Sequence, residues 1–213
     1  MSYDVEVQVL SPTFQDDMDF TLETYIRDIS ICDEIIDFFH NSRFAEIHRS
    51  PGITYGGTDE GKKSTDLTMY QSEWHNFPVI VNYVEQLRDC TDDYIRKFPY
   101  CNEYGPWGLV EGFNIQWYKP GEGFYNWHTE RCNASLPYNN RHLVWMTYLN
   151  HVEEGGGTEF YHQKHTVQAR KGKTLIWPGD WTYTHRGEVA PNEHKYIITG
   201  WFSYHEPLVP AGN

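Results

Sequence analysis

The chain has 213 residues and a formal net charge of −13, with 39% hydrophobic and 22% charged residues. This length fits one large domain, and the composition is that of a globular protein rather than a disordered or collagen-like chain. A strongly negative surface repels polyanions, so a general nucleic-acid-binding role is disfavoured. Aromatic residues reach 16%, which together with 17 Gly and 11 Pro favours β structure.

The cysteines and the absence of long apolar segments bear on the cellular setting. Four cysteines, Cys32, Cys90, Cys101 and Cys132, form no C-x-x-C pair, so neither a zinc ribbon nor a thioredoxin-type site is indicated. The sequence shows no run of about 18 apolar residues and no signal-peptide pattern at its start. We therefore expect no membrane partner and a reducing, cytoplasmic setting, which for a virally encoded protein is the host cytoplasm.

The first half of the chain shows mostly helical periodicity. Ser30–Asn41 places its apolar residues on one face, and Pro78–Phe98 carries a second apolar stripe that begins at a proline suited to a first helical turn. Between them, Arg49–Asp66 is rich in Gly, Ser, Thr and Lys and predicts a long loop, which is often functional in a compact domain. Residues 1–108 are therefore expected to form a mainly helical support region, with a long loop at 49–66.

From residue 109 onwards the pattern changes to short strands separated by turns. Strands at this spacing predict a sandwich or jelly roll, so 109–205 is expected to form the β core of a single domain, 1–213, of the α+β, mainly β class. The predicted strands are Val110–Tyr118, Leu143–Leu149, Thr158–Tyr161, Thr166–Arg170, Thr174–Trp177, Thr182–Arg186 and Lys195–Tyr204.

One predicted strand, Val110–Tyr118, has two contrasting faces. Its odd-numbered side chains from Phe113 to Trp117 are apolar, and its even-numbered ones from Asn114 to Tyr118 are polar. Because side chains alternate along a strand, the apolar face requires a core. The polar face either meets solvent, as on an edge strand, or lines a polar cavity inside a barrel.

Two histidines are followed two residues later by a glutamate, in His128-Thr-Glu130 and His151-Val-Glu153. A mononuclear non-haem iron site uses two imidazoles and one carboxylate, and ligands at i and i+2 near a strand end project the same way. His128 follows a Gly-rich turn and fits this placement, whereas His151 precedes three glycines and is typical of an exposed hairpin tip. Candidates for the third ligand are His162, His165, His185, His194 and His205, of which His185 ends a predicted strand.

Lys195 lies ten residues after His185 and opens the last predicted strand. It shares a strand face with Ile197, Thr199 and Trp201, where a lysine is costly unless it meets an anion. An exposed lysine at a strand start is the simpler interpretation of this residue alone. The order of His-x-Glu, a distant histidine and then a cation is more specific than any of its parts.

These motifs, in this order, resemble the 2-oxoglutarate/Fe(II)-dependent dioxygenases, and within them the prolyl-4-hydroxylase-like group, with similarity also to the HIF prolyl hydroxylases. The resemblance covers about residues 110–204 and implies a double-stranded β-helix (jelly roll) with supporting N-terminal helices. It rests on Tyr118-x-Pro-Gly-x-Gly-x-Tyr125-x-x-His128, on Arg141 followed by Thr147-Tyr-Leu-Asn150, on Glu153-Glu-Gly-Gly-Gly-Thr-Glu-Phe160 and on Lys195-x-x-x-Thr-x-Trp201.

The resemblance implies His128, Glu130 and His185 as the catalytic Fe(II) ligands, with 2-oxoglutarate as cosubstrate and ascorbate as a further cofactor. The family usually has aspartate where this chain has Glu130, which still supplies an anionic oxygen but is one methylene longer. Lys195 is expected to hold the distal carboxylate of 2-oxoglutarate. The implied cosubstrate pocket consists of Tyr118, Tyr148, Lys195, Thr199 and Trp201, and the implied substrate region of Tyr125, Arg131, Arg141 and Trp181.

The implied activity is 2-oxoglutarate-, O2- and Fe(II)-dependent hydroxylation of a C–H bond, foremost of a prolyl or other side chain in a peptide or protein. The loops Arg49–Asp66 and Arg131–Asn140 are then expected to form a lid over an extended peptide. Two alternatives stay open: the same chemistry on a small molecule such as a free amino acid, and a jelly-roll binding module that has lost catalysis. A nucleic-acid demethylase is disfavoured by the negative charge, and the sequence does not indicate an oligomeric state.

Overall fold

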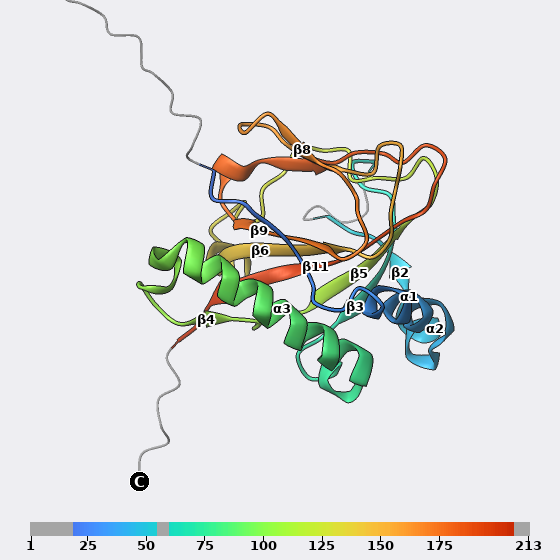
Figure 1. Ribbon diagram of the computed structural model, residues 1–213, viewed down its shortest axis with the longest axis horizontal. Coiled ribbons are helices and arrows are strands. Elements are labelled where there is room, and N and C mark those ends of the chain that lie inside the picture. Colours follow the sequence, from blue (N-terminus) through green and yellow to red (C-terminus); the bar gives the residue numbers. More distant parts are fainter. Residues whose placement is uncertain (1–18, 55–59, 207–213) are drawn as a thin grey trace, which may run out of the picture.

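The computed structural model describes residues 19–54 and 60–206, which form two antiparallel sheets and three α-helices (Figure 1). The larger sheet has eight strands in the order β1-β9-β6-β11-β5-β3-β2, with β4 also paired to β11, and the smaller has the order β10-β7-β8. The strands are β1 (Leu22–Tyr25), β2 (Ser50–Pro51), β3 (Thr65–Met69), β4 (Trp107–Gly108), β5 (Phe113–Tyr118), β6 (Arg141–Tyr148), β7 (Thr158–Phe160), β8 (His165–Val167), β9 (Lys173–Pro178), β10 (His185–Gly187) and β11 (Lys195–Tyr204). The helices are α1 (Ile31–Asn41), α2 (Arg43–His48) and α3 (Pro78–Lys97), and the 3-10 turns are η1 (Trp74–Asn76), η2 (Pro99–Asn102), η3 (Tyr138–Asn140) and η4 (Trp181–Tyr183).

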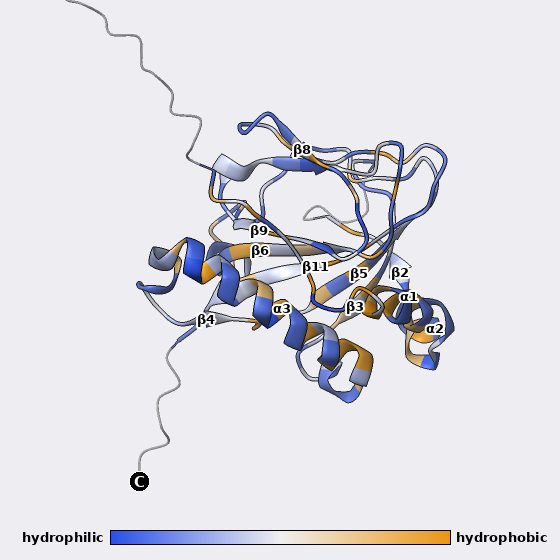
Figure 2. Ribbon diagram, in the orientation of Figure 1, coloured by the Kyte–Doolittle hydropathy of each residue, from blue (hydrophilic) through white to orange (hydrophobic). Residues whose placement is uncertain are grey.

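The helices cover one face of the large sheet (Figure 1). In α1, Ile31, Ile35 and Phe39 recur at helical spacing and are fully buried. Helix α3 begins with Pro78 in its first turn, and its hydrophobic residues form stripes among polar ones (Figure 2). The two helices predicted from the periodicity are confirmed with ends that differ by one residue.

The large sheet separates two hydrophobic cores. Along β6, Leu143 and Trp145 belong to the core shared with the helices, whereas Val144, Met146 and Tyr148 belong to the core between the two sheets. This alternation follows from the period of two along a strand. The smaller sheet closes the second core, so the two sheets form the jelly roll that the sequence predicts.

The turn between β6 and β7 contains two glycines in the left-handed region. Gly155 and Gly156 both have φ of 68°, a conformation that side-chain-bearing residues rarely adopt. A Cβ atom at Gly155 would also lie 2.1 Å from the carbonyl oxygen of Val189. The glycine run after His151 is therefore required by the turn, and His151 itself is exposed, as predicted.

One predicted strand is wrong in part. The segment expected as a strand over Thr182–Arg186 instead forms η4 (Trp181–Tyr183) and then β10 (His185–Gly187). The N–H of Tyr183 donates to the carbonyl of Asp180 and the N–H of Thr184 to that of Trp181, so the chain turns before it pairs with β7. The alternation in this segment thus reflects a tight turn and not an extended strand.

The elements β1, α2 and β3 are not expected from the sequence. Helix α2 has six residues and starts where the Ser42 hydroxyl accepts from the N–H of Ala45, a signal too short for a periodicity argument. Strand β3 includes the end of the predicted loop and pairs with β5. Residues 55–59 of that loop lie outside the described part of the chain.

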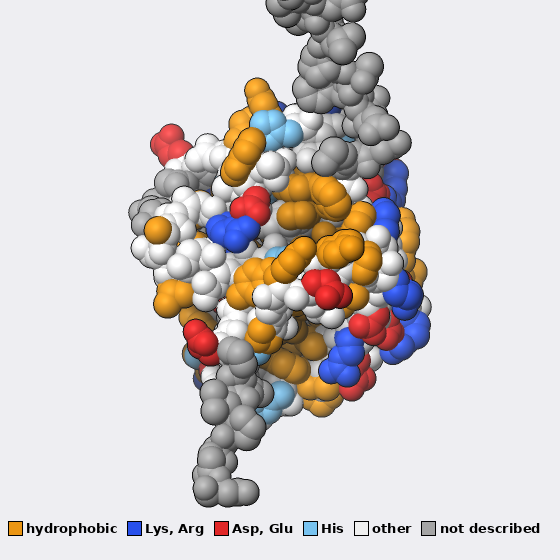
Figure 3. Space-filling view, turned by 90° about the vertical axis from the view of Figure 1, so that its left-hand side faces the viewer, with side chains coloured by type: hydrophobic (Ala, Val, Ile, Leu, Met, Phe, Trp, Pro, Cys, Tyr) orange, Lys and Arg blue, Asp and Glu red, His pale blue; other side chains and the backbone are white. Residues whose placement is uncertain are grey.

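One face of the molecule shows hydrophobic side chains over its middle, with charged side chains around them (Figure 3). Within the described residues, no helix is long and apolar enough to cross a membrane. All four cysteines are free thiols.

Candidate metal centre

His128, Glu130 and His185 come together where β10 begins at His185. His128 and His185 face each other in an isolated antiparallel bridge, in which each N–H donates to the other's carbonyl oxygen at 3.0 and 2.9 Å. This bridge sets the two imidazole centroids 4.3 Å apart. Glu130 lies two residues beyond His128, so its side chain projects towards the same side.

The ligand atoms of these three residues converge. Nε2 of His128 and Nε2 of His185 each lie 3.6 Å from Oε1 of Glu130. Potential ligand atoms from all three side chains lie within 4.8 Å of one another, as expected of two imidazoles and one carboxylate around a single ion.

Hydrogen bonds fix which ring nitrogen of each histidine faces the cluster. Nδ1 of His128 lies 2.9 Å from the carbonyl oxygen of Asn126, and Nδ1 of His185 lies 2.9 Å from that of Tyr183. A carbonyl only accepts, so each Nδ1 carries a proton, and Nε2 is the ring nitrogen left to bind a metal. Metal-binding histidines are commonly oriented in this way by the partner of the other ring nitrogen.

The electrostatics of the cluster fit a divalent cation. Burial lowers the pKa of His185, and the neighbouring His128 adds to this effect, so His185 favours the neutral form that binds metals. Burial acts to raise the pKa of Glu130, but the hydrogen bonds and charges of the two histidines hold it well below its usual range. One carboxylate and two imidazoles suit iron(II).

The cluster opens into a cavity of about 1040 Å³ between the two sheets. Its walls include Asn114, Gln116 and Tyr118 from β5, which confirms that the polar face of this strand lines a cavity. Phe113 and Ile115, on the other face, are fully buried against the helices.

Lys195 is the cation of this cavity that lacks a carboxylate partner. Lys195 is 5% exposed, and among the described residues it forms no ion pair. Its Nζ donates to the carbonyl oxygen of Gly157 at 3.4 Å. Burial lowers its pKa to about 8, against a weaker opposing influence of Glu188. Burial of an ammonium without a counter-charge is costly, and an anion that enters the cavity would offset that cost.

The other residues of the predicted cosubstrate pocket surround Lys195 to different degrees. Nζ of Lys195 lies 5.6 Å from the ring centre of Tyr118 and 5.5 Å from that of Tyr148. Tyr118, Thr199 and Trp201 line the cavity. Tyr148 is fully buried, and its hydroxyl contacts the Thr158 hydroxyl and the Val167 carbonyl, so it lies behind the lining.

The structure separates the four residues predicted for the substrate region. Arg141 lines the cavity. Arg131 does not line the cavity and forms an ion pair with Asp180. The hydroxyl of Tyr125 donates to the carbonyl of Gly121 within its own turn. Trp181 is 66% exposed on η4, outside the cavity lining. Of the four, the structure brings only Arg141 to the cavity.

A polar network in the cavity wall is missed by sequence analysis. Nζ of Lys62 lies 2.7 Å from Oδ2 of Asp66, both side chains are buried, and the amide of Gln116 donates to the same oxygen at 3.3 Å. Gln116 in turn accepts from the hydroxyl of Tyr118 at 2.7 Å. In β3, Leu67 and Met69 alternate with Asp66 and Thr68, and this alternation could have predicted a strand with a polar face. The composition of the preceding segment favours a loop instead.

Comparison with known proteins identifies this architecture. Residues 113–203 match the sequence model of the 2OG-Fe(II) oxygenase superfamily. A search of curated protein sequences finds no match.

Solved prolyl hydroxylases share the fold at low sequence identity. A viral collagen prolyl hydroxylase from Paramecium bursaria Chlorella virus-1, in complex with 2OG, has 17% identity and a TM-score of 0.64, covering 89% of this chain and 98% of the other. A Pseudomonas putida prolyl-4-hydroxylase has 13% identity and a TM-score of 0.64, covering 89% and 95%. A Trichoplax adhaerens prolyl hydroxylase, in complex with a hypoxia-inducible factor peptide fragment, has 16% identity and a TM-score of 0.66, covering 88% and 84%.

Two histidines and one carboxylate around a single open site are typical of the non-haem iron(II) oxygenases. The matched segment, residues 113–203, is a 2OG-Fe(II) oxygenase domain, which supports assignment of the chain as a 2-oxoglutarate-dependent dioxygenase. The recognition made from the sequence motifs is thereby confirmed, and the family implies Fe(II) and 2-oxoglutarate as the groups that the site takes.

Proposed function

We propose that the chain hydroxylates a prolyl or other side chain of a peptide or protein, with Fe(II) held by His128, Glu130 and His185 and 2-oxoglutarate held by Lys195. One observation carries the proposal: the converging ligand atoms share a cavity with a buried ammonium that forms no ion pair with any described residue. The two features are close, since a Cβ atom at Gly187, two residues after His185, would lie 3.7 Å from Nζ of Lys195. A metal ion and a dicarboxylate complement them.

When bound, Fe(II) and 2-oxoglutarate supply the oxidative chemistry that uses O2 to hydroxylate a C–H bond. The side chains of this protein bind and orient these groups, and they exclude water from the site. Lys195 neutralises the distal carboxylate of the cosubstrate. The ring of Phe124 stacks on His128 with centroids 3.7 Å apart, and Trp177 packs edge-on against His185 at 5.1 Å. These rings restrict water on the outer sides of the two imidazoles.

The residues at the mouth of the cavity favour a peptide as the substrate. Its lining includes Pro51, Ile53, Tyr70, Pro137 and Tyr138, so both loops that were expected to form a lid contribute to it. Ile53 and Tyr70 are 66% and 58% exposed, which gives the mouth apolar surface that a flexible peptide can cover. The solved structure with a bound peptide fragment has the same fold, and a prolyl side chain is therefore our first candidate.

The test is aerobic turnover of proline-containing peptides and of free amino acids, with Fe(II), 2-oxoglutarate and ascorbate, analysed by mass spectrometry. We expect a gain of one oxygen atom on a peptide and an equal amount of succinate, with both lost in His185→Ala. Modification of free amino acids alone would reassign the substrate to a small molecule. A wild-type protein that binds neither Fe(II) nor 2-oxoglutarate would instead be a binding module that has lost catalysis.

A further inference from the structure

The two oxygens of Glu130 have different partners. Oε1 faces Nε2 of both histidines, as described above. Oε2 points away from them and accepts from Nε1 of Trp201 at 2.8 Å and from Nη1 of Arg141 at 3.3 Å. One oxygen is thus left for a metal ion, while the other is held by protein donors.

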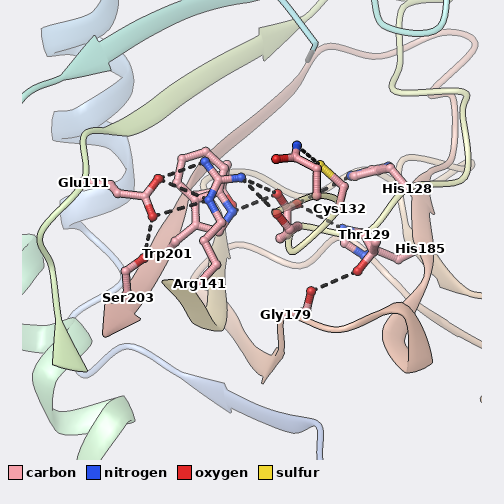
Figure 4. Close-up of polar contacts among 12 residues, drawn as sticks. Glu111, His128, Thr129, Cys132, Arg141, Gly179, His185, Trp201 and Ser203 are labelled. Atoms are coloured by element: carbon pink, nitrogen blue, oxygen red, sulfur yellow. Dashed lines mark hydrogen bonds and ion pairs between the residues drawn. The ribbon is translucent and has the colours of Figure 1, made fainter. Parts of the chain in front are cut away.

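Arg141 is itself held by a second carboxylate. Its Nε and Nη2 donate to Oε2 of Glu111 at 3.1 and 2.9 Å, and the hydroxyl of Ser203 donates to the other Glu111 oxygen. The guanidinium also stacks on the Trp201 ring at 3.5 Å from its centre. Figure 4 shows Glu111 on one side of Arg141 and the two histidines on the other. The arginine therefore lies between two carboxylates and is only 6% exposed.

This arrangement offsets a specific weakness of glutamate as a ligand. Glutamate has one more rotatable bond than aspartate, so it loses more rotamer freedom when it is fixed in one geometry. Charge-assisted hydrogen bonds from an arginine fork combine directional restraint with charge. An unrestrained Glu130 could turn both oxygens towards the ion or rotate away from it, whereas Arg141 and Trp201 retain Oε2 on the far side.

We propose that Arg141 is a positioning residue for Glu130, which keeps the longer carboxylate in a one-oxygen geometry towards the metal, and that Glu111 fixes Arg141 for this task. The inference rests on the proposed role of Glu130 as a ligand. It replaces the expectation that Arg141 contacts the substrate, since the donors of its guanidinium are directed to Glu111 and Glu130. The competing explanation is an ion pair that only stabilises the fold.

The test measures binding of Ni(II) to tag-free protein by calorimetry, without substrate or cosubstrate. Nickel is the probe because it binds nitrogen ligands more tightly than iron(II), so weakened variants stay measurable. We expect Arg141→Met to lower the affinity by roughly 10- to 100-fold, the range typical of residues that support a ligand. Arg141→Lys should recover part of the loss. Arg170→Met, which removes an exposed ion pair to Glu153 at 3.2 Å, is the matched control and should bind as wild type does.

A second background separates positioning from folding. In Glu130→Ala, Arg141 has no ligand to orient, so adding Arg141→Met should cause no further loss of affinity. An equal loss in both backgrounds, or no loss in the wild-type background, would overturn the inference. If Arg141→Met does not fold, Glu111→Gln decides in its place: a several-fold loss supports the inference, and wild-type affinity overturns it.

The metal centre itself is controlled separately. His185→Ala should abolish the single tight site in every background. If the wild-type protein binds Ni(II) no more tightly than His185→Ala does, the proposed metal centre is wrong. That result differs from one in which Arg141 has no influence on an existing metal centre. Circular dichroism and the thermal midpoint of each variant report folding independently of metal binding.

Discussion

Lys195 and Tyr118 are register partners on neighbouring strands of the large sheet, and both side chains face the cavity between the sheets. The ammonium of Lys195 lies 5.6 Å from the centre of the Tyr118 ring and finds no carboxylate within ion-pair distance among the described residues. Folding therefore leaves a desolvated positive charge at a fixed place. Such a site gains most from a ligand that brings the missing negative charge.

Lys195→Ala should raise the Michaelis constant for 2-oxoglutarate steeply and leave iron binding nearly intact. Truncating one partner of a buried charge pair costs on the order of 2–5 kcal/mol, or roughly 30- to several-thousand-fold in affinity. Lys195→Arg should do less harm, since it keeps the charge on a larger fork. The measurement is succinate formation against 2-oxoglutarate concentration at saturating iron. An unchanged Michaelis constant in Lys195→Ala would show that Lys195 does not bind the cosubstrate.

The pH dependence of cosubstrate capture should report the same lysine. Its pKa is lowered to about 8, and only the protonated form attracts a carboxylate, so kcat/KM for 2-oxoglutarate should fall as the pH rises through about 8. Burial raises the pKa values of Tyr118 and Tyr148, so neither ionises in this range. In Lys195→Arg the guanidinium stays charged, and this fall should disappear. A fall that persists in the arginine variant would assign the titration to another group.

The Lys195 strand could be predicted from sequence because its signal is local. Lys195, Ile197, Thr199 and Trp201 alternate along one face, and the observed β11 has the predicted bounds. The same holds for the polar face of β5, whose side chains line the cavity. Strand periodicity therefore predicts which side chains share a face, whereas the sheet order decides that the polar face of β5 meets a cavity and not solvent.

The support around Glu130 could not be predicted, because its contacts join distant segments. Glu111 precedes β5, Arg141 opens β6 and Ser203 lies near the end of β11, and only the sheet order brings them together. Family resemblance assigns Arg141 to the substrate, whereas its burial between two carboxylates fits a positioning task. Trp181, four residues before the ligand His185 in sequence, is exposed on η4, and its substrate role stays a prediction.

Substitutions of Glu130 should separate the effect of its negative charge from the effect of its side-chain length. Glu130→Asp should keep measurable turnover, because small backbone shifts can bring the shorter carboxylate to the ion. Glu130→Ala should lose most activity, with a larger drop in metal affinity than the roughly 10- to 100-fold typical of supporting residues. Succinate release and metal titration measure the two effects. Normal turnover in Glu130→Ala would show that the site needs only its two histidines.

The Lys62–Asp66 pair in the cavity wall has a predictable influence on stability. The two side chains are 5% and 10% exposed and lie 2.7 Å apart, and the Ser64 hydroxyl donates to the second oxygen of Asp66 at 2.7 Å. Removing one member of a buried ion pair leaves an uncompensated charge, whereas removing both avoids that penalty. Lys63, the next residue, offers an exposed comparison, with its Nζ 3.8 Å from Glu122.

Asp66→Ala should lower the free energy of unfolding by about 3–5 kcal/mol, because it leaves the Lys62 ammonium buried without its carboxylate. The double variant Lys62→Met, Asp66→Leu removes both charges and should unfold at a free energy closer to that of the wild type than Asp66→Ala does. Lys63→Met should cost less than about 1 kcal/mol, as exposed pairs do. Urea unfolding followed by tryptophan fluorescence measures all three. A double variant as unstable as Asp66→Ala would show that lost packing, and not the stranded charge of Lys62, causes the destabilisation.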